Sequence, residues 1–585
     1  MMAKQIQLSP RHESFLGSDG DALVLGGPGA GKTTIALLKA GREAATGRLK
    51  PNQRCLFLSF ARATVARVTE TAQEQLDQEA LRSIAIDTYH GFTWKLLRSH
   101  GYLIGLPRPL ALITPPDEAA LLAEVRASSA TKAERALRTR QEQERLALRE
   151  GKVSFDLFAE MAADLLEQHP CLRQVVGLAY PTVFLDEFQD TNAHEWRLIL
   201  ELGRSCRLLA LADPDQRIYE FRGADPARIG QFTAARSPLV IELGDDNHRS
   251  DGTDIVAFGN DLLTGRNRGK TYQQVKVVRW TYHSKSPVFQ LRTQVLASLK
   301  RLIKHGRGWS VAVLVPTKRM MIQASDALND GSRGLPPIHH TVSIDPEGPT
   351  LAARAIAYLM EPATEPLDKL DQIIGHVASF YRGRGGSDPN ATDLKESTAL
   401  ETALRAYRTT GRLRSKSILG PIMETLKGLR AVTMSGDPES DWLAVRRHLD
   451  GCDCKRLRFI AAQARYVRLL GRGSQLRESL SASWRSHGRY ADAVAIVDQA
   501  FAHEHFANST RATRGVVVMN MHKAKGKEFD EVILYESDKH SRYRRHQSTD
   551  REAHQAVLNL RVSVTRARQR VTILTPDADP SPLIV

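Results

Sequence analysis

Short apolar runs alternate with longer stretches of helical periodicity along most of the chain. The runs lie at 22–27, 55–60, 84–88, 182–187 and 207–213, and then at 275–282, 311–316, 516–520, 532–536 and 571–575. Near-continuous apolar strands that alternate with helices are typical of parallel sheets covered on both faces. The pattern therefore predicts an α/β fold with two parallel sheets flanked by helices.

Two helical, charged segments interrupt this alternation and predict insertions. Residues 96–175 are rich in Glu, Arg, Ala and Leu and interrupt the first sheet, and residues 346–504 are Arg-rich and interrupt the second. Amphipathic, charge-laced periodicity of this kind favours helices. The predicted sheet domains are then assembled from separate pieces, 1–95 with 176–244, and 245–345 with 505–585.

Composition is that of a globular protein with a strongly basic balance. Of 585 residues, 42% are hydrophobic and 25% are charged. We find no apolar run near the ~18 residues that a membrane span needs. The stretch MMAKQIQLSPRHESF lacks the apolar segment of a signal peptide, and five cysteines suit a reducing compartment, so we expect a cytoplasmic protein.

The net charge of +16 indicates a polyanionic partner. It is unevenly distributed, because residues 401–490 hold 18 Lys and Arg against 8 Asp and Glu. Charge alone does not separate DNA, RNA and an acidic protein.

The strongest local signal is G-x-x-x-x-G-K-T, which runs from Gly26 to Thr33 between a predicted strand and a predicted helix. Backbone N–H groups in such a loop wrap a phosphate, Lys32 neutralises β/γ-phosphate charge, and Thr33 can ligate Mg²⁺. The predicted nucleotide-binding residues are Gly26, Gly27, Pro28, Gly29, Ala30, Gly31, Lys32, Thr33 and Thr34.

A second signal is VFLDEFQDTN, in which an apolar strand ends in Asp186 and Glu187. A buried carboxylate is costly unless a cation compensates it, and a Mg·nucleotide at the neighbouring strand end would do so. Asp186 is then the predicted metal ligand, and Glu187 is the predicted base that takes a proton from the attacking water. For Asp190, capping of the following helix is an alternative role.

These motifs, followed by ADPDQRIYEFRGA, NHRS, MHKAKGKEFDEV and VTRAR, occur in the order seen in the UvrD/Rep-like superfamily 1 helicases, which the chain resembles from residue 26 to residue 568. The resemblance implies two RecA-like domains, 1A and 2A, with inserted domains 1B and 2B. It also implies an ATP-driven translocase that moves 3′→5′ on single-stranded nucleic acid.

The resemblance assigns further roles at the nucleotide. Gln216 resembles the γ-phosphate sensor, and Arg249 and Arg566 resemble the arginines that reach the γ-phosphate from the second RecA-like domain. His248 stands where an aromatic residue stacks on adenine, and Glu528 resembles a ribose contact. His12 replaces the glutamine expected to read adenine.

The resemblance also places a single-strand track on the chain. Its predicted members are Phe60, His90, Phe92, Tyr219, Phe221 and Arg222. Aromatic platforms suit a motor that is blind to sequence, because every base has a π-face. Core packing is the alternative role for each aromatic side chain.

Three hypotheses follow. The first is an ATP- and Mg²⁺-dependent 3′→5′ DNA helicase that acts on single-stranded DNA and on junctions with duplex, in repair, recombination or phage defence. The second is a DNA-stimulated regulatory ATPase that serves a partner nuclease or repair protein and unwinds little by itself. The third is an NTPase unrelated to nucleic acid.

Overall fold

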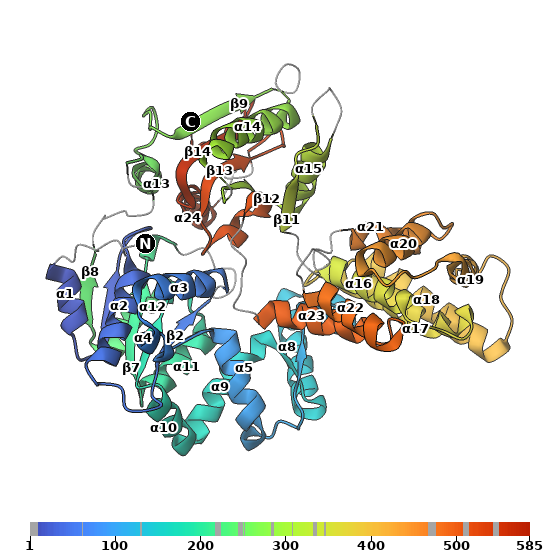
Figure 1. Cartoon of the computed structure of the whole chain (residues 1–585), viewed down its shortest axis with the longest axis horizontal. Coiled ribbons are helices and arrows are strands. Elements are labelled where there is room, and N and C mark those ends of the chain that lie inside the picture. The colour runs from blue at the N-terminus through green and yellow to red at the C-terminus, as the bar shows by residue number, and fades with distance from the viewer. Residues whose placement is uncertain are drawn as a thin grey trace. The chain divides into compact units, whose positions relative to one another are not determined.

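A computed structural model describes residues 10–60, 62–128, 131–216, 224–243, 250, 252–281, 286–306, 308–330, 336–343, 347–465, 475–506, 514–541 and 549–584. The chain divides into two compact units (Figure 1). We call them the sheet unit, made of Met1–His100, Ala159–Ile344 and Asn508–Val585, and the helical unit, made of Gly101–Phe158 and Asp345–Ala507. Among the described residues, no helix has the length and apolar character that crossing a membrane requires.

The first sheet of the sheet unit has six strands in the order β3-β2-β6-β7-β1-β8, and every neighbouring pair is parallel. Its strands are β1 (Ala22–Leu25), β2 (Cys55–Ser59), β3 (Ile84–Thr88), β6 (Thr182–Leu185), β7 (Arg207–Ala212) and β8 (Leu239–Glu242). Side chains that alternate along these strands enter two separate cores, one on each face. The predicted burial on both faces is confirmed.

The second sheet also has six parallel strands, in the order β11-β12-β10-β13-β14-β9. Its strands are β9 (Val275–Trp280), β10 (Ser310–Val315), β11 (His340–Ser343), β12 (Gly515–Asn520), β13 (Phe529–Tyr535) and β14 (Ala567–Pro576). Cores again lie on both of its faces. The predicted α/β class with two parallel sheets is therefore confirmed.

The prediction missed the edge strands β8 and β11, and also β4 (Ala111–Ile113) and β5 (Lys152–Ser154), which pair with each other. The two edge strands are four residues long; β8 buries only Ile241, and all four residues of β11 are half-buried. Such strands lack the long apolar run by which the central strands are found.

Helices cover both faces of the two sheets. In the sheet unit they are α1 (Pro10–Gly17), α2 (Lys32–Ala45), α3 (Arg62–Gln75), α4 (Gln78–Arg82), α5 (Tyr89–His100), α10 (Pro170–Ala179), α11 (Ala193–Gly203), α12 (Arg228–Arg236), α13 (Ile255–Thr264), α14 (Pro287–Leu302), α15 (Lys318–Asn329) and α24 (Asp550–Val564). On the first sheet, α2 and α3 contribute to one core and α11 and α12 to the other.

The helical unit brings both predicted insertions into one compact body. Its helices are α6 (Pro115–Leu121), α7 (Ala123–Ser128), α8 (Lys132–Glu150), α16 (Glu347–Met360), α17 (Leu370–Gly383), α18 (Ala391–Thr410), α19 (Leu419–Gly428), α20 (Pro438–Asp450), α21 (Lys455–Ala464), α22 (Gln475–His487) and α23 (Ala493–Phe506). The inserted segments are thus mainly helical, as the sequence predicts.

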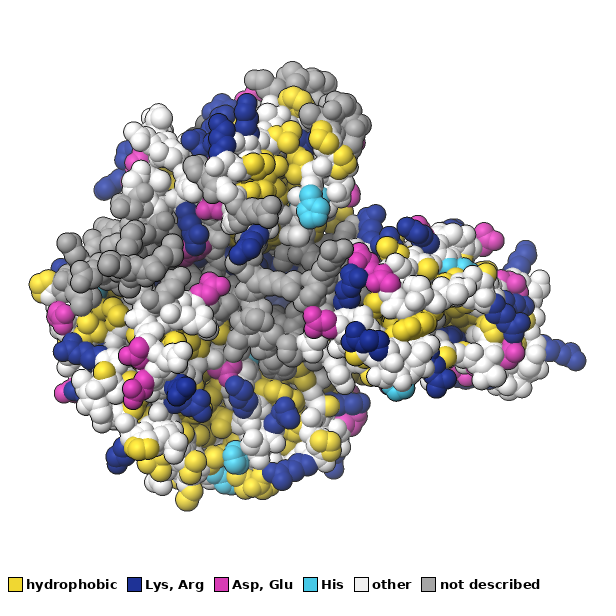
Figure 2. All heavy atoms as spheres, viewed as in Figure 1, with side chains coloured by type: hydrophobic (Ala, Val, Ile, Leu, Met, Phe, Trp, Pro, Cys, Tyr) yellow, Lys and Arg dark blue, Asp and Glu magenta, His cyan; other side chains and the backbone are white. Residues whose placement is uncertain are grey.

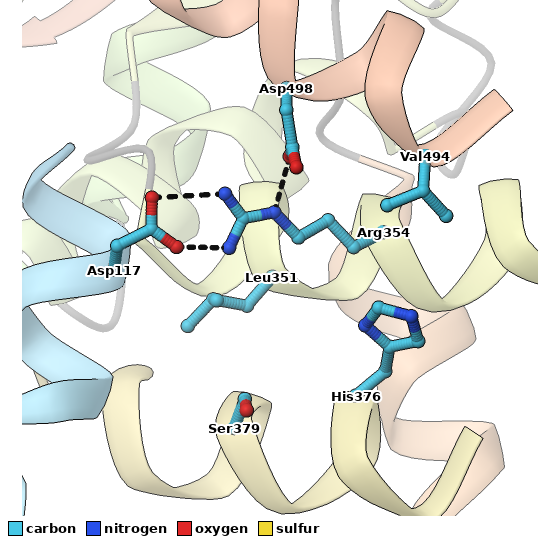
Figure 3. Close-up of a pocket in the computed structure, with 7 residues that line it drawn as sticks. All are labelled: Asp117, Leu351, Arg354, His376, Ser379, Val494 and Asp498. Atoms are coloured by element: carbon cyan, nitrogen blue, oxygen red, sulfur yellow. Dashed lines mark hydrogen bonds and ion pairs between the residues drawn. The ribbon is translucent and has the colours of Figure 1, made fainter. Parts of the chain in front are cut away.

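Arg354 of α16 joins the two insertions. Its guanidinium binds both carboxylate oxygens of Asp117 on α6, and its Nε donates to Asp498 on α23 (Figure 3). A cavity of about 380 Å³ lies beside this cluster, and His376 of α17 lines it. A Cβ on Gly383 would lie 3.1 Å from the Pro116 carbonyl oxygen of α6, so only glycine fits this close approach without a shift.

The helical unit takes 101–158 and 345–507 from the chain, and the predicted insertions are 96–175 and 346–504. The difference arises because α9 (Phe155–Gln168) crosses the boundary. Its residues Ala162, Ala163 and Leu166 are buried in the core of the first sheet. The further division into domains 1A, 1B, 2A and 2B stays a prediction.

Candidate nucleotide site

The glycine-rich loop connects β1 to α2 at the carboxyl edge of the first sheet. Gly29 and Gly31 have φ of 82° and 80°, a left-handed conformation that glycine adopts without steric cost. A Cβ on Gly26 would lie 3.1 Å from the Ala30 Cβ, so the tight turn also needs glycine there. The loop therefore has the backbone geometry of an anion cradle.

Lys32 begins α2 and folds back onto this loop. Its Nζ donates to the backbone oxygens of Gly26, over 2.6 Å, and Gly27, over 3.0 Å. The ammonium is thus held at the mouth of the cradle, where β/γ-phosphate charge would lie. Thr33 and Thr34 follow in the first turn of the helix and are partly exposed.

Asp186 directly follows β6 and is only 4% exposed. Its Oδ2 accepts a hydrogen bond of 3.3 Å from the Ser59 hydroxyl, and its backbone N–H donates to the Leu58 carbonyl oxygen. Burial also raises the pKa of the neighbouring Tyr89 phenol well above its ordinary value, and the carboxylates of Glu195 and Asp186 add to that shift.

Glu187 has the left-handed φ of 53°, which is costly for a residue with a Cβ. The Gln189 side-chain amide donates to Glu187 Oε2 over 2.7 Å, and the N–H of Asp190 donates to the Glu187 carbonyl oxygen over 2.9 Å. Two local hydrogen bonds thus hold Glu187 in this turn, the 3-10 helix η2 (Phe188–Asp190).

One expectation about this edge is wrong. The loop and the acids were expected at neighbouring strand ends, but β7 lies between β1 and β6. The strand between them contributes a carboxylate of its own, since Asp213 follows β7 and is 3% exposed. Its N–H donates to the Gln189 side-chain oxygen over 3.1 Å, which joins the two strand ends.

Gln216, at the end of the 3-10 helix η3 (Pro214–Gln216), is 4% exposed and donates from Nε2 to Asp213 over 2.8 Å. Its side-chain oxygen accepts a hydrogen bond of 2.9 Å from Arg566, which precedes β14 of the second sheet. The structure therefore brings together the predicted sensor Gln216 and the predicted arginine Arg566.

Two further cations of the second sheet meet this edge. Lys525 Nζ donates to the Asp190 carboxylate and lies 3.4 Å from Glu187 Oε2. Arg561 of α24 is 2% exposed, and its Nη1 lies 3.7 Å from Asp213 Oδ1. Positive side chains from one sheet thus face carboxylates of the other.

The helix-capping role considered for Asp190 is wrong. Asn192 is the N-cap of α11, where its side chain accepts from the Glu195 N–H and completes a capping box. Asp190 is 5% exposed and paired with Lys525 instead.

Sequence reasoning did not assign roles to Lys525, Gln189 or Asp213. For Asp213 a signal existed, because it ends an apolar strand as Asp186 does. Lys525 lies inside the quoted motif MHKAKGKEFDEV, but nothing in that motif says which of its lysines is buried.

The other residues at predicted nucleotide-binding positions are Glu528, His12, His248 and Arg249. Glu528 is partly buried and pairs with Arg568 over 3.2 Å. His12 is buried in α1. His248 and Arg249 lie outside the described residues.

The residues of this edge fit a Mg·nucleotide. Within the described part of the chain, no group of three or more His, Cys, Asp and Glu side chains could hold a metal ion by itself. Thr33 and Asp186 offer a hydroxyl and a carboxylate, the partial oxygen set that suits Mg²⁺ shared with phosphates. Together with the cradle and Lys32, these groups can hold ATP and its magnesium ion.

The predicted single-strand track is only partly described. Phe60 stacks on Tyr89 with ring centroids 4.4 Å apart, and Phe60 and His90 are half-buried. Phe92 is 5% exposed and packs edge-on against Tyr180 within the core, so we now assign it to packing rather than to strand binding. The remaining members lie outside the described residues, namely Tyr219, Phe221 and Arg222.

Comparisons with known proteins agree with this geometry. Residues 10–149 and 132–236 match the model of the UvrD/REP helicase N-terminal domain. The chain is 25% identical over 281 residues to DNA helicase II of Haemophilus influenzae, covering 42% of this chain and 38% of that protein. It is 23% identical over 278 residues to the ATP-dependent DNA helicase Rep of Salmonella typhimurium, covering 42% and 41%.

A shorter match reaches a different kind of protein. Over 118 residues the chain is 29% identical to the exonuclease/helicase subunit RexA of Lactococcus lactis, covering 20% of this chain and 10% of that protein. In each of these comparisons the chain spans less than half the length of the relative.

Proposed function

We propose that the protein is an ATP-dependent DNA helicase, because residues 10–236 match the model of the UvrD/REP helicase N-terminal domain. It would hydrolyse ATP at the edge built by the glycine-rich loop and the acids after β6. It would use that energy to move 3′→5′ on single-stranded DNA and to open the duplex ahead. The relatives' names support ATP-dependent DNA unwinding.

One observation carries the proposal. Arg566 of the second sheet donates to Gln216 at the carboxyl edge of the first sheet, which also bears the loop, Asp186 and Glu187. Guanidinium groups stabilise the charge that develops during phosphoryl transfer. A site completed by a residue from the other sheet would make hydrolysis depend on closure of the two sheets.

Each residue then has a defined task. The loop and Lys32 hold the phosphates, and Thr33 and Asp186 would hold the magnesium ion, which supplies positive charge on the phosphoryl oxygens. Glu187 accepts the proton of the attacking water. Gln216 lies in the 3-10 helix η3, which follows β7, and its neutral side chain can respond to the γ-phosphate without repelling it.

The same site could serve a second function. The match to an exonuclease/helicase protein favours a DNA-stimulated ATPase that works with a partner nuclease and unwinds little alone. Both functions need the same ATP site, so residues at this edge do not separate them.

A strand-separation assay separates them. The purified chain is given ATP, magnesium and a labelled duplex with either a 3′ or a 5′ single-stranded tail. If the protein is a helicase, the parental chain should separate the 3′-tailed duplex and leave the 5′-tailed duplex intact. The variant Glu187→Gln should separate neither duplex. ATP hydrolysis stimulated by the tail without any separation would instead support the regulatory function.

A further inference from the structure

Lys525 follows a strand of the second sheet, and its buried ammonium reaches the carboxyl edge of the first sheet. It is 5% exposed and follows the 3-10 helix η9 (Met521–Ala524) after β12. Its ammonium donates to the Asp190 carboxylate and, over 2.7 Å, to the backbone oxygen of Gln216. It also lies 3.4 Å from Glu187 Oε2. Asp190 and Gln216 lie 335 and 309 residues from Lys525 in the sequence, so these contacts form only in the folded protein.

The positive charge of Lys525 and the negative charges of Asp190 and Glu187 stabilise one another. A buried ammonium needs acceptors and a counter-charge, and Asp190, itself 5% exposed, supplies both. Without Lys525, the carboxylates of Asp190 and Glu187 would stand three residues apart in one tight turn with less positive charge to separate them. The arrangement of the two acids therefore depends on a residue from the other sheet.

The turn that Lys525 touches is the one that orients Glu187. Glu187 opens η2 with a φ of 53°, a conformation that persists only where the surroundings fix it. Asp190 closes the turn by donating its N–H to the Glu187 carbonyl oxygen over 2.9 Å. Lys525 holds the Asp190 end through its side chain and stands beside the carboxylate of Glu187 at the other end.

We propose that Lys525 is a positioning residue that makes the orientation of Glu187 depend on the second sheet. The inference rests on the proposed function, because the orientation of Glu187 matters only if it receives the proton of the attacking water. When Lys525 binds Asp190, the turn η2 keeps its conformation and the Glu187 carboxylate keeps its orientation. When the second sheet withdraws, the turn loses its cation and hydrolysis stops.

The kinetic test separates turnover from binding. Lys525→Met is expected to lower the DNA-stimulated maximal rate by about tenfold or more, with nucleotide affinity changed by less than about threefold. Lys525→Arg should recover much of the lost rate, because a guanidinium can also bridge the two acids. The matched control is Lys523→Met, which lies in the preceding 3-10 helix η9. The Lys523 Nζ lies 3.4 Å from the Ser343 carbonyl oxygen of β11, and the variant should turn over at the parental rate.

A second readout needs no nucleotide. Hydrogen exchange followed by mass spectrometry should show peptides over 186–192 exchanging about tenfold faster in Lys525→Met and in Asp190→Asn, because either change frees the turn. Lys523→Met should leave that exchange unchanged. The variant Asp190→Asn tests the contact from the first sheet, in case Lys525→Met does not fold.

The outcomes are distinct. Parental exchange over 186–192 in both variants would overturn the positioning role, and so would a loss confined to nucleotide affinity. If the parental protein hydrolyses no ATP in the presence of DNA, the proposed function fails, whereas the exchange result still decides whether Lys525 holds this turn.

Discussion

Arg566 donates a hydrogen bond of 2.9 Å to the side-chain oxygen of Gln216, across 350 residues of sequence. The Arg566 side chain is 1% exposed and is also held by the Val562 carbonyl oxygen of α24. Because this cation is buried and held by the preceding helix α24, it moves with the second sheet. The contact therefore couples the sheets at the proposed site of hydrolysis.

Arg566→Ala should reduce maximal ATP turnover by about a thousandfold while changing ATP affinity little, because its charge is needed when the transition state forms. Steady-state hydrolysis and equilibrium binding of a fluorescent nucleotide measure the two quantities. Arg570→Ala, four residues along on β14, is the matched control and should retain parental values. A loss of affinity at unchanged turnover would assign Arg566 to ground-state binding.

Lys32→Ala and Glu187→Gln should fail in different ways. Removal of Lys32 takes away the cation at the mouth of the cradle, so nucleotide binding should weaken. Glu187→Gln leaves the cradle intact but removes the base, so binding should persist while hydrolysis slows by about a hundredfold or more. Hydrolysis at the parental rate by Glu187→Gln would show that another group accepts the proton.

The helical unit should lose stability on mild acidification because of His376. Burial, and then the nearby Arg354 charge, lower the pKa of His376 to about 4, and Asp117 and Asp498 line the same cavity. The folded pKa lies below the ordinary 6.5, so between these values the unfolded chain binds a proton that the folded chain does not. The contribution of His376 to stability is therefore fully present above pH 6.5 and is lost as the pH drops toward 4.

At pH 5 this loss amounts to about 2 kcal/mol. Hydrogen exchange of α17, corrected for intrinsic rates and compared at pH 7 and pH 5, measures it. His376→Leu should flatten the dependence by that amount, while acids common to both proteins cancel in the comparison. Identical pH dependence in the two proteins would mean that His376 does not titrate in this range.

The exposed cluster Arg412, Arg414 and Lys416 follows α18 in the helical unit, where Lys and Arg side chains are prominent on the surface (Figure 2). None of the three forms an ion pair with a residue that the structure describes. Each phosphate contact contributes about 0.9 to the salt slope of binding. Charge reversal of all three to Glu should therefore lower the slope for a tailed duplex by between about one and three.

Binding to bare single strand should change little in this variant. The control reverses Arg485 and Arg489, exposed cations elsewhere in the same unit. An unchanged salt slope on the tailed duplex would show that the cluster does not contact DNA, and would favour an acidic protein as its partner.

Much of this architecture follows from local sequence. The central strands were found because they are buried on both faces, and the phosphate loop was found because its glycines and Lys32 have fixed spacing. The edge strand β8, with only Ile241 of its four residues buried, carries no comparable pattern.

The contacts between the sheets could not be found in this way. Which lysine of MHKAKGKEFDEV is buried depends on the fold that brings Asp190 within reach of Lys525, and local spacing contains no such information. Phe92 shows the opposite error, because a motif position suggested strand binding where the side chain packs into the core. The place of β7 between β1 and β6 is likewise set by strand order, which the order of motifs along the chain does not reveal.

The most direct test of the central claim is steady-state ATP hydrolysis by the purified chain with and without single-stranded DNA. A motor that closes its two sheets on a nucleotide while bound to a strand predicts magnesium-dependent hydrolysis that single-stranded DNA stimulates by about tenfold or more, and that Glu187→Gln abolishes. Hydrolysis that DNA leaves unchanged, in a protein that binds ATP normally, would contradict the account.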